Sequence, residues 1–570
     1  MLNVITQDAD VTKLKGEAEI GLLSSKASFN IPIIKNKLAL TVSERISNYS
    51  ILNLLSPLTM ASTGTQLLVY FGDTNANLFW KIADNNTVKV SYFGNSDGFE
   101  VYNSMYVMGS ESKAWRKNSQ KNGNVCWTIK PTNNIENNLF VYTDLYNFDY
   151  GDRTGPPSNP NQSYNYTYSS IGSNGLEDKV AVRISDSLNV SFGTALKMYN
   201  FMPFSHASSY YTDLNLNKLP IVSQMDGTAF VESVYSFTKQ QTLTTGLRLN
   251  AIGNETKTYT FLEPRLGYHG VFSNDYSISA SMGKMSQSIH CVGNSGLGFT
   301  NDMFFSSTYG LMPQTSWSYS LGAAKDFRWE KKMLSFKVDG WYRTFQNIVE
   351  FKDGYDMNIF LSVPMQNSVA TYPKEVLTQG NGKAYGVDCS MDYSMRSFTF
   401  GANYTLMKAV QQFDDLNNGL PFAAPTDMRH NISLTSELKL SDEWSFCATW
   451  QFHTGRAITV PTAIFADPTE LPNPYFLKAF PTQYMTVETE RNNFITKDFH
   501  KLDISFAHKY KAFRKYKGLF SVGIYNVYNR ANTFAYSIVP VPLSDGKYSI
   551  ALKSMSLFPI MPSFNWLVKF

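Results

Sequence analysis

The chain has 570 residues, of which 17% are charged and 15% aromatic, and a net charge of +4. This small charge argues against nucleic acid as a partner, and the basic run at 510–518 is interpreted as a solvated turn. No stretch of 18 or more apolar residues occurs, which excludes a helical membrane protein. Two classes remain: a large soluble β protein, or a transmembrane β-barrel in which lipid-facing apolar residues alternate with polar lumen residues.

The N-terminus, MLNVITQDADVTKLKG, has neither the basic region nor the apolar segment of a signal peptide. This start fits a cytosolic protein, or a gene product whose first part is missing from the chain. The patterns that follow favour the second interpretation.

Alternation of apolar and polar residues with period two continues along almost the whole chain. Examples are KASFNIPI (26–33), NLFVYTDLY (138–146) and LDISFAHKY (502–510). Helical periodicity is nearly absent. The pattern therefore predicts an all-β protein.

The connections between these segments alternate between short polar turns, such as IKNK (34–37), and long stretches rich in Asn, Ser, Gly and Pro. The long connections are predicted at 148–178, 201–225, 287–314, 352–382, 411–428, 455–497 and 530–556. Such alternation is typical of an outer-membrane barrel, with short periplasmic turns on one side and long extracellular loops on the other. Counting roughly 11 loops and 10 turns gives an antiparallel barrel of about 22 strands.

The chain ends in PSFNWLVKF, in the middle of a predicted strand. Phe564, Trp566, Val568 and Phe570 share one face of this strand. We expect the last strand to pair with the first and close the barrel, which removes any free edge. The terminal aromatic ring is then expected at the inner membrane–water boundary.

Several segments, in this order along the chain, resemble the TonB-dependent outer-membrane receptor family. They include FLEPRLGY (261–268), YNVYNRANTF (525–534) and SLFPIMPSFNWLVKF (556–570). LNVIT (2–6) resembles the final strand of the plug domain that precedes the barrel in this family. The resemblance implies a remnant of that plug at 1–10 and a transmembrane β-barrel at 11–570.

A complete receptor of this family carries a signal peptide, a TonB box and a globular plug, none of which is recognised here, so a truncated form is expected. The resemblance implies uptake of a scarce solute, such as a metal chelate, glycan or peptide, across the outer membrane of a Gram-negative bacterium. The implied partners are outer-membrane lipid, a possible surface lipoprotein, and the TonB complex if a plug is supplied. A passive plugless channel and a surface-displayed binding or adhesion protein remain as alternatives.

Two groups of charged residues are candidates for the lumen or for loop bases. Glu263 and Arg265 lie two apart on one strand and are expected to face the lumen, where they either form a structural ion pair or contact plug or solute. Asp427, Arg429 and His430 lie where a long loop re-enters the barrel, and ordering of the loop base is preferred over ligand binding.

Aromatic residues of the 148–178 stretch are candidates for solute binding. Tyr164, Tyr166 and Tyr168 lie in Asn/Ser/Gly-rich sequence and are predicted to contact solute, whereas the alternative assigns aromatic residues here to the outer interface girdle. No catalytic constellation, metal-ligand spacing or cofactor motif is recognised, so no enzyme activity, metal or cofactor is predicted.

Overall fold

The structure is a computed structural model that describes residues 8–48, 65–105, 110–154, 163–210, 213–218, 221–253, 257–272, 275–293, 303–307, 310–353, 375–466, 484–487, 490–542, 548–556 and 559–570. The LNVIT segment at 2–6 lies outside these residues. No helix in the described part is long and apolar enough to span a membrane.

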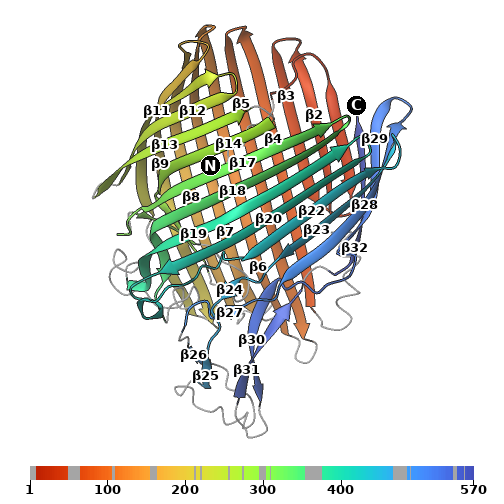
Figure 1. Cartoon of the computed structure of the whole chain (residues 1–570). Helices are drawn as coiled ribbons and strands as arrows, with labels where there is room; N and C mark the ends of the chain where they lie inside the picture. The colour runs from red at the N-terminus through yellow and green to blue at the C-terminus, as the bar shows by residue number, and fades with distance from the viewer. Residues whose placement is uncertain are drawn as a thin grey trace.

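Most of the described chain forms one large antiparallel sheet (Figure 1). Its strands are β1 (Lys15–Gly21), β2 (Ser24–Ile34), β3 (Leu38–Ser47), β4 (Thr65–Ala83), β5 (Asn86–Met105), β6 (Ser110–Thr132), β7 (Ile135–Thr154), β8 (Ser163–Arg183), β9 (Leu188–Tyr210), β10 (Asp213–Lys218), β11 (Val222–Thr238), β12 (Gln241–Gly253), β13 (Thr258–Phe272), β14 (Tyr276–Gln287), β17 (Gln314–Trp329), β18 (Lys332–Phe351), β19 (Leu377–Met395), β20 (Phe398–Gln412), β21 (Phe422–Ala423), β22 (His430–Lys439), β23 (Trp444–His453), β28 (Phe499–Ala512), β29 (Tyr516–Tyr525) and β32 (Met561–Lys569).

The sheet closes on itself because β1 pairs with β32. The short strand β10 pairs with β9, which also pairs with β11, and the short strand β21 pairs with β20, which also pairs with β22. Because β10 and β21 add no position of their own, the 24 strands of the sheet form a ring of 22. The predicted closed antiparallel barrel of about 22 strands is confirmed. Short turns gather at the upper end in Figure 1, and the strand ends that the longer connections join lie at the other end.

Four shorter hairpins or strand pairs lie in the long connections. They are β15 (Ile289–Val292) with β16 (Met303–Ser306), β24 (Ala457–Ile458) with β27 (Phe494–Ile495), β25 (Ala463–Ala466) with β26 (Tyr484–Val487), and β30 (Ala535–Pro542) with β31 (Tyr548–Met555). A single 3-10 turn, η3 (Asn417–Gly419), is part of the connection between β20 and β22. These elements belong to the end of the barrel that carries the long connections.

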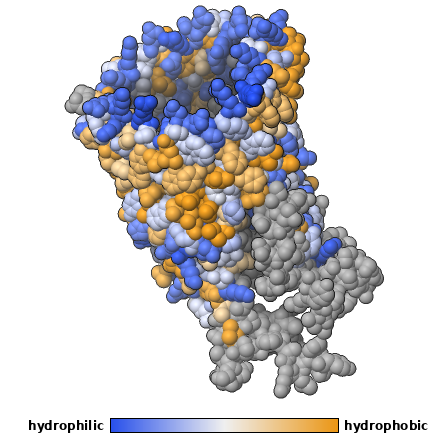
Figure 2. Space-filling view, turned by 90° about the vertical axis from the view of Figure 1, so that its right-hand side faces the viewer, coloured by the Kyte–Doolittle hydropathy of each residue, from blue (hydrophilic) through white to orange (hydrophobic). Residues whose placement is uncertain are grey.

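Two faces of the wall differ in chemistry because successive side chains of a strand point to opposite sides of the sheet. On β13, Leu262 and Leu266 are about half exposed on the outer face, whereas Glu263 between them is buried. On the face of the barrel shown in Figure 2, an apolar band therefore crosses the outer wall between more polar ends. This is the alternation expected of a wall that meets hydrocarbon outside and water inside.

Some predicted loops are strands in the structure. The stretch 148–178 was predicted as a long connection, but β7 continues to Thr154 and β8 begins at Ser163; likewise β9 continues to Tyr210 within 201–225. These predictions are wrong because a polar composition indicates that a segment contacts water and does not indicate that its backbone is irregular. With 19 to 23 residues each, β4 to β9 far exceed the roughly 9–11 residues that cross a bilayer, so their ends extend the wall into water.

The barrel seam is held on both faces of β32. On the outer face, Trp566 and Phe570 are each about 40% exposed, and the ring of Phe570 lies over Gly16 of β1, where a Cβ atom would be only 2.2 Å from it. On the other face, Lys569 pairs with Glu17 (3.1 Å) and the Asn565 amide donates to Glu19 (2.6 Å). The terminal strand is thus held to β1 by apolar packing on the outer face and by an ion pair and a hydrogen bond on the inner face.

Replacing Phe570 by alanine is expected to lower the free energy of unfolding by about 1–2 kcal/mol, since its ring also packs against Phe29 and Tyr516. The seam has only five residue pairs in register, so each contact there weighs heavily. Urea unfolding in detergent micelles measures the change. Phe336→Ala, which removes an equally exposed ring from a long strand pair, is the matched control and should cost less. Equal costs would contradict a special role for the seam.

Candidate functional site

The lumen face of β6 to β11 carries a set of polar and aromatic side chains. The Asp144 carboxylate accepts hydrogen bonds from Asn122 and from Ser173 (3.1 Å). Lys197 of β9 lies over the rings of Tyr142 and Tyr199, 5.4 and 4.7 Å from their centroids. Amides, carboxylates, an ammonium group and ring faces therefore alternate along a wall that a dissolved solute can contact.

The Asp226 carboxylate of β11 extends this set toward the long-loop end. It accepts hydrogen bonds from the Gln224 amide (2.7 Å) and the Ser288 hydroxyl (2.9 Å). Ser288 does not belong to the wall: it follows β14 and leads into the β15–β16 hairpin. The bond therefore joins the wall to a segment of a connecting loop.

The β15–β16 hairpin packs against two separate parts of the wall. Its residues contact β8 and β9 on one side and β18 on the other. Phe304 meets Tyr146 of β7 edge to face, with ring centroids 5.5 Å apart. Because Tyr146 alternates with the outward-facing Leu145, this contact lies on the lumen side. The hairpin is thus folded inward rather than projecting from the barrel rim.

An apolar core holds the hairpin in this position. Its buried members are Val292, Met303, Phe305, Leu311, Val349, Phe351, Val376 and Leu377. The Ser306 hydroxyl donates to Gln224 (2.6 Å), and His290 bonds through Nε2 to the Ser307 hydroxyl (3.1 Å). Burial lowers the pKa of His290 to about 4, so this ring is neutral at neutral pH. The hairpin is therefore a packed part of the structure at the outer mouth of the lumen.

Glu263 and Arg265 lie on the lumen face of β13. The Glu263 carboxylate is 2% exposed and accepts hydrogen bonds from the backbone amide (2.8 Å) and hydroxyl (2.5 Å) of Ser286. Arg265 approaches it at 3.4 Å on the same strand and Arg248 of β12 at 3.9 Å. The carboxylate is thus enclosed between three strands, an arrangement that fits the structural ion pair better than contact with a solute.

Asp427, Arg429 and His430 lie together at the base of the connection between β20 and β22. Asp427 accepts a hydrogen bond from the backbone amide of Ala409 (2.9 Å) and pairs with Arg429 (3.5 Å). His430 shares a hydrogen bond with the Tyr404 hydroxyl (2.9 Å) and stacks on its ring. These bonds tie the returning chain to the preceding strand, as ordering of a loop base requires.

Tyr164, Tyr166 and Tyr168 lie on strand β8, so the prediction that they belong to an irregular loop is wrong. The Tyr168 hydroxyl donates to Asn147 (2.7 Å), and Tyr166 stacks on Trp115 of β6. Asn147 alternates on β7 with Tyr146, which faces the lumen, so these rings lie on the outer face. The side chain of Tyr164 is outside the described part. A role in solute binding stays a prediction, and the outward placement favours the aromatic girdle.

The sequence interpretation missed the inward-folded hairpin, because 287–314 was predicted only as a long connection. A signal was present: short apolar runs such as MFF (303–305) interrupt a stretch otherwise rich in Asn, Ser and Gly. Within the described ranges, no three His, Cys, Asp or Glu side chains gather as metal ligands. Cys126, Cys291, Cys389 and Cys447 are not joined in disulfide bonds.

A closed 22-stranded ring with a polar lumen and an apolar outer band defines the class of transmembrane β-barrels. Residues 47–529 match the family described as "TonB dependent receptor-like, beta-barrel", and the chain belongs to this family, whose members are receptors and transporters of the outer membrane. The sequence matches none of the curated proteins with which it was compared.

Solved structures of the family share the fold at low sequence identity. The ferric yersiniabactin uptake receptor of Yersinia pestis aligns with a TM-score of 0.63 and 12% identity, over 99% of this chain and 81% of its own. The copper transporter OprC aligns with a TM-score of 0.60 and 11% identity, over 98% of this chain and 79% of its own. The ferripyoverdine receptor of the Pseudomonas aeruginosa outer membrane aligns with a TM-score of 0.59 and 11% identity, over 98% of this chain and 72% of its own.

Proposed function

We propose that this chain forms the solute conduit of a TonB-dependent transporter in the outer membrane of a Gram-negative bacterium. The observation that carries the proposal is the closed ring whose lumen wall is lined by amides, carboxylates and ring faces, with Asp144, Lys197 and Asp226 among them. A barrel that served only as a membrane anchor has no need of such a lining.

The solute is a scarce, polar molecule too large for general diffusion pores, such as a metal chelate, glycan or peptide. Mixed hydrogen-bonding groups and aromatic faces suit ligands of this kind. The solved structures with the same fold include a copper transporter and a ferric yersiniabactin uptake receptor, and these support a transported solute without identifying it. Energy for uptake comes from the TonB complex acting on a segment within the lumen.

Accumulation of labelled solutes by cells that carry or lack the intact gene tests the proposal. Uptake that depends on the gene and stops when a protonophore abolishes the inner-membrane proton gradient supports an energised transporter. Gene-dependent uptake that persists with the protonophore would instead identify a passive channel. Surface binding without accumulation would identify an adhesion protein.

A further inference from the structure

The short-turn end of the barrel carries charge unevenly. Its rim, at the upper end of Figure 2, is hydrophilic on the face shown there. Near the turns that join β4 to β5, β6 to β7 and β8 to β9, each cation has a carboxylate partner: Lys81 pairs with Asp84 (2.6 Å), Lys130 with Glu136 (2.9 Å) and Arg183 with Asp186 (2.7 Å). The charges on this side of the rim are therefore neutralised pair by pair.

The turns that follow β19, β22 and β28 differ, because most of their charge is not neutralised. Residues 394–397, 439–444 and 509–517 together hold seven basic residues and two acidic ones. Five of the basic residues, which we call the basic arc, are exposed and form no ion pair with a carboxylate of the described residues: Arg396, Lys439, Lys509, Lys511 and Lys517. This sector of the rim thus has an excess of positive charge.

The lysines of β28 face the mouth of the lumen and not the lipid. Lys509 and Lys511 alternate along the strand with His508 and Tyr510. The Tyr510 hydroxyl accepts a hydrogen bond from the indole of Trp566, which lies on the outer face. Because successive side chains point to opposite sides of the sheet, the aromatic rings lie outside and the two ammonium groups inside. The barrel wall therefore separates these cations from membrane lipid.

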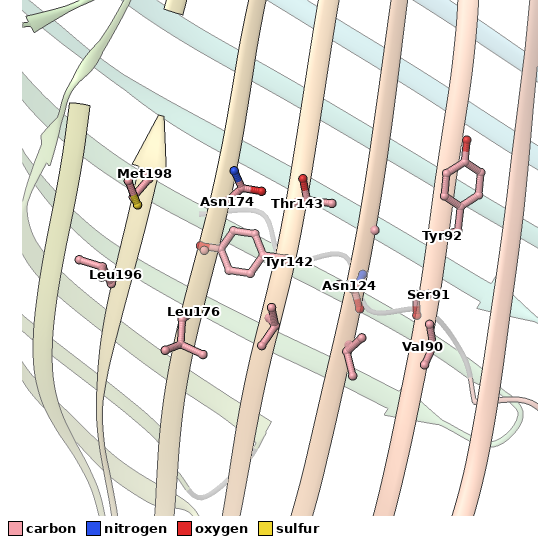
Figure 3. A pocket seen from close by; sticks show the side chains of 14 residues that line it. Val90, Ser91, Tyr92, Asn124, Tyr142, Thr143, Asn174, Leu176, Leu196 and Met198 are labelled. Carbon is pink, nitrogen blue, oxygen red and sulfur yellow. The ribbon is translucent and has the colours of Figure 1, made fainter. Parts of the chain in front are cut away.

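A hollow of about 480 Å³ lies within the basic arc. It is lined by Arg396, Lys439 and Lys509, by three serines and by the two acidic residues of the β22–β23 turn. The backbone amides of Lys439 and Lys509 donate to the carbonyl groups of Ser397 and Glu443, both at 2.8 Å, so neighbouring turns hold the cations in place. By contrast, the hollow in the wall of β5 to β9 is lined largely by apolar side chains such as Leu176 (Figure 3).

The length of the basic arc favours an extended ligand. It follows the ends of β20, β22, β23, β28 and β29, which at the usual strand spacing cover about 20 Å. A single phosphate or carboxylate contacts only part of this length, whereas a polymer with repeated negative charges contacts several cations at once. The serine hydroxyls of the hollow both donate and accept hydrogen bonds, which suits a polymer that also carries hydroxyl and amide groups.

We propose that the basic arc binds peptidoglycan, the glycan polymer of the periplasm whose peptides carry carboxylates. These carboxylates pair with the ammonium and guanidinium groups, and the sugar hydroxyls and peptide amides bond to the serines. The short turns of an outer-membrane barrel face the periplasm, so the arc is directed toward this polymer. The inference rests on the outer-membrane location, and it depends neither on the transported solute nor on the TonB complex.

Cosedimentation of the full chain in detergent micelles with purified peptidoglycan sacculi measures this binding. The wild-type chain should bind, and the triple variant Lys439→Gln, Lys509→Gln, Lys511→Gln should bind about tenfold more weakly, because three exposed charge pairs are lost together. Binding by the wild type should also weaken as the ionic strength rises. Amidation of the carboxylates of the sacculi should weaken it to a similar degree.

The triple variant Lys81→Gln, Lys130→Gln, Arg183→Gln is the matched control. It removes the same net charge from the same end of the barrel, but from cations that already have carboxylate partners, so it should bind like the wild type. Absence of binding by the wild type, or equal loss in both variants, would overturn the proposal.

Two further probes separate peptidoglycan from other anionic partners. Binding of the wild type to anionic phospholipid vesicles but not to sacculi would identify a membrane surface instead, and binding to polyglutamate alone would identify an acidic protein; either result would overturn the proposal. The assay contains neither solute nor TonB complex, so its failure leaves the proposed transport function unaffected.

Discussion

Replacing Glu263 by leucine is expected to lower the free energy of unfolding by about 2–4 kcal/mol. The carboxylate is nearly inaccessible to water and holds two hydrogen bonds from Ser286. Its loss removes the acceptor of those two donors and of the Arg265 guanidinium, and it takes away the negative charge that faces Arg248, whose guanidinium still donates to the Thr228 hydroxyl (3.2 Å). The arginine side chains are about one-third exposed, so water partly compensates them and keeps the cost below that of a fully enclosed pair.

Urea unfolding in detergent micelles measures this cost. Glu263→Gln is the matched variant: it keeps an acceptor for Ser286 and removes only the charge, so it should cost about half as much. Arg265→Ala removes a partner that water can replace and should cost about 1 kcal/mol or less. A Glu263→Leu barrel as stable as the wild type would contradict the structural role assigned to this carboxylate.

Releasing the β15–β16 hairpin is expected to increase the conductance of the barrel in planar bilayers. Asp226→Ala removes the acceptor of the Ser288 hydroxyl, and Phe305→Ala removes a fully buried ring from the core beneath the hairpin. The double variant should therefore free the hairpin from the wall and widen the outer mouth.

Asp144→Ala provides the control for this experiment. It removes a lumen carboxylate that bonds to Asn122 and Ser173 of the wall, not to the hairpin. Its conductance should stay close to that of the wild type. If the double variant also conducts like the wild type, the hairpin does not limit the conduit.

Acidification is expected to loosen the hairpin as well. The docked hairpin keeps His290 neutral, since burial lowers its pKa from 6.5 to about 4. This stabilisation is complete above pH 6.5 and is lost as the pH falls toward 4, by an amount on the order of 2–3 kcal/mol. Conductance should rise over this interval, and His290→Gln should reduce the rise by removing the titrating ring. An equal rise in that variant would assign the effect to the lumen carboxylates instead.

The sequence predicted the structure correctly where the surroundings of each residue, lipid or water, decide whether that residue is apolar or polar. Lipid outside and water inside force apolar and polar residues to alternate, so the alternation predicted strands, and the aromatic face of Phe564, Trp566 and Phe570 predicted a strand that closes the ring. It failed where the composition of a segment was used to predict whether its backbone is a strand or a loop. Tyr166 and Tyr168 were predicted in a loop, because a strand that extends beyond the membrane has polar residues on both faces, as a loop does.

The sequence by itself determined the kind of wall, the approximate number of strands and the family, because each depends on a local pattern repeated along the chain. Tertiary structure decided which loop folds inward and which strands lie beside Asp226 and Glu263. These features depend on residues far apart in sequence: the hairpin touches β8, β9 and β18, and Glu263 lies between side chains of β12 and β14. Such contacts exist only once the ring closes and its curvature sets which side chains meet.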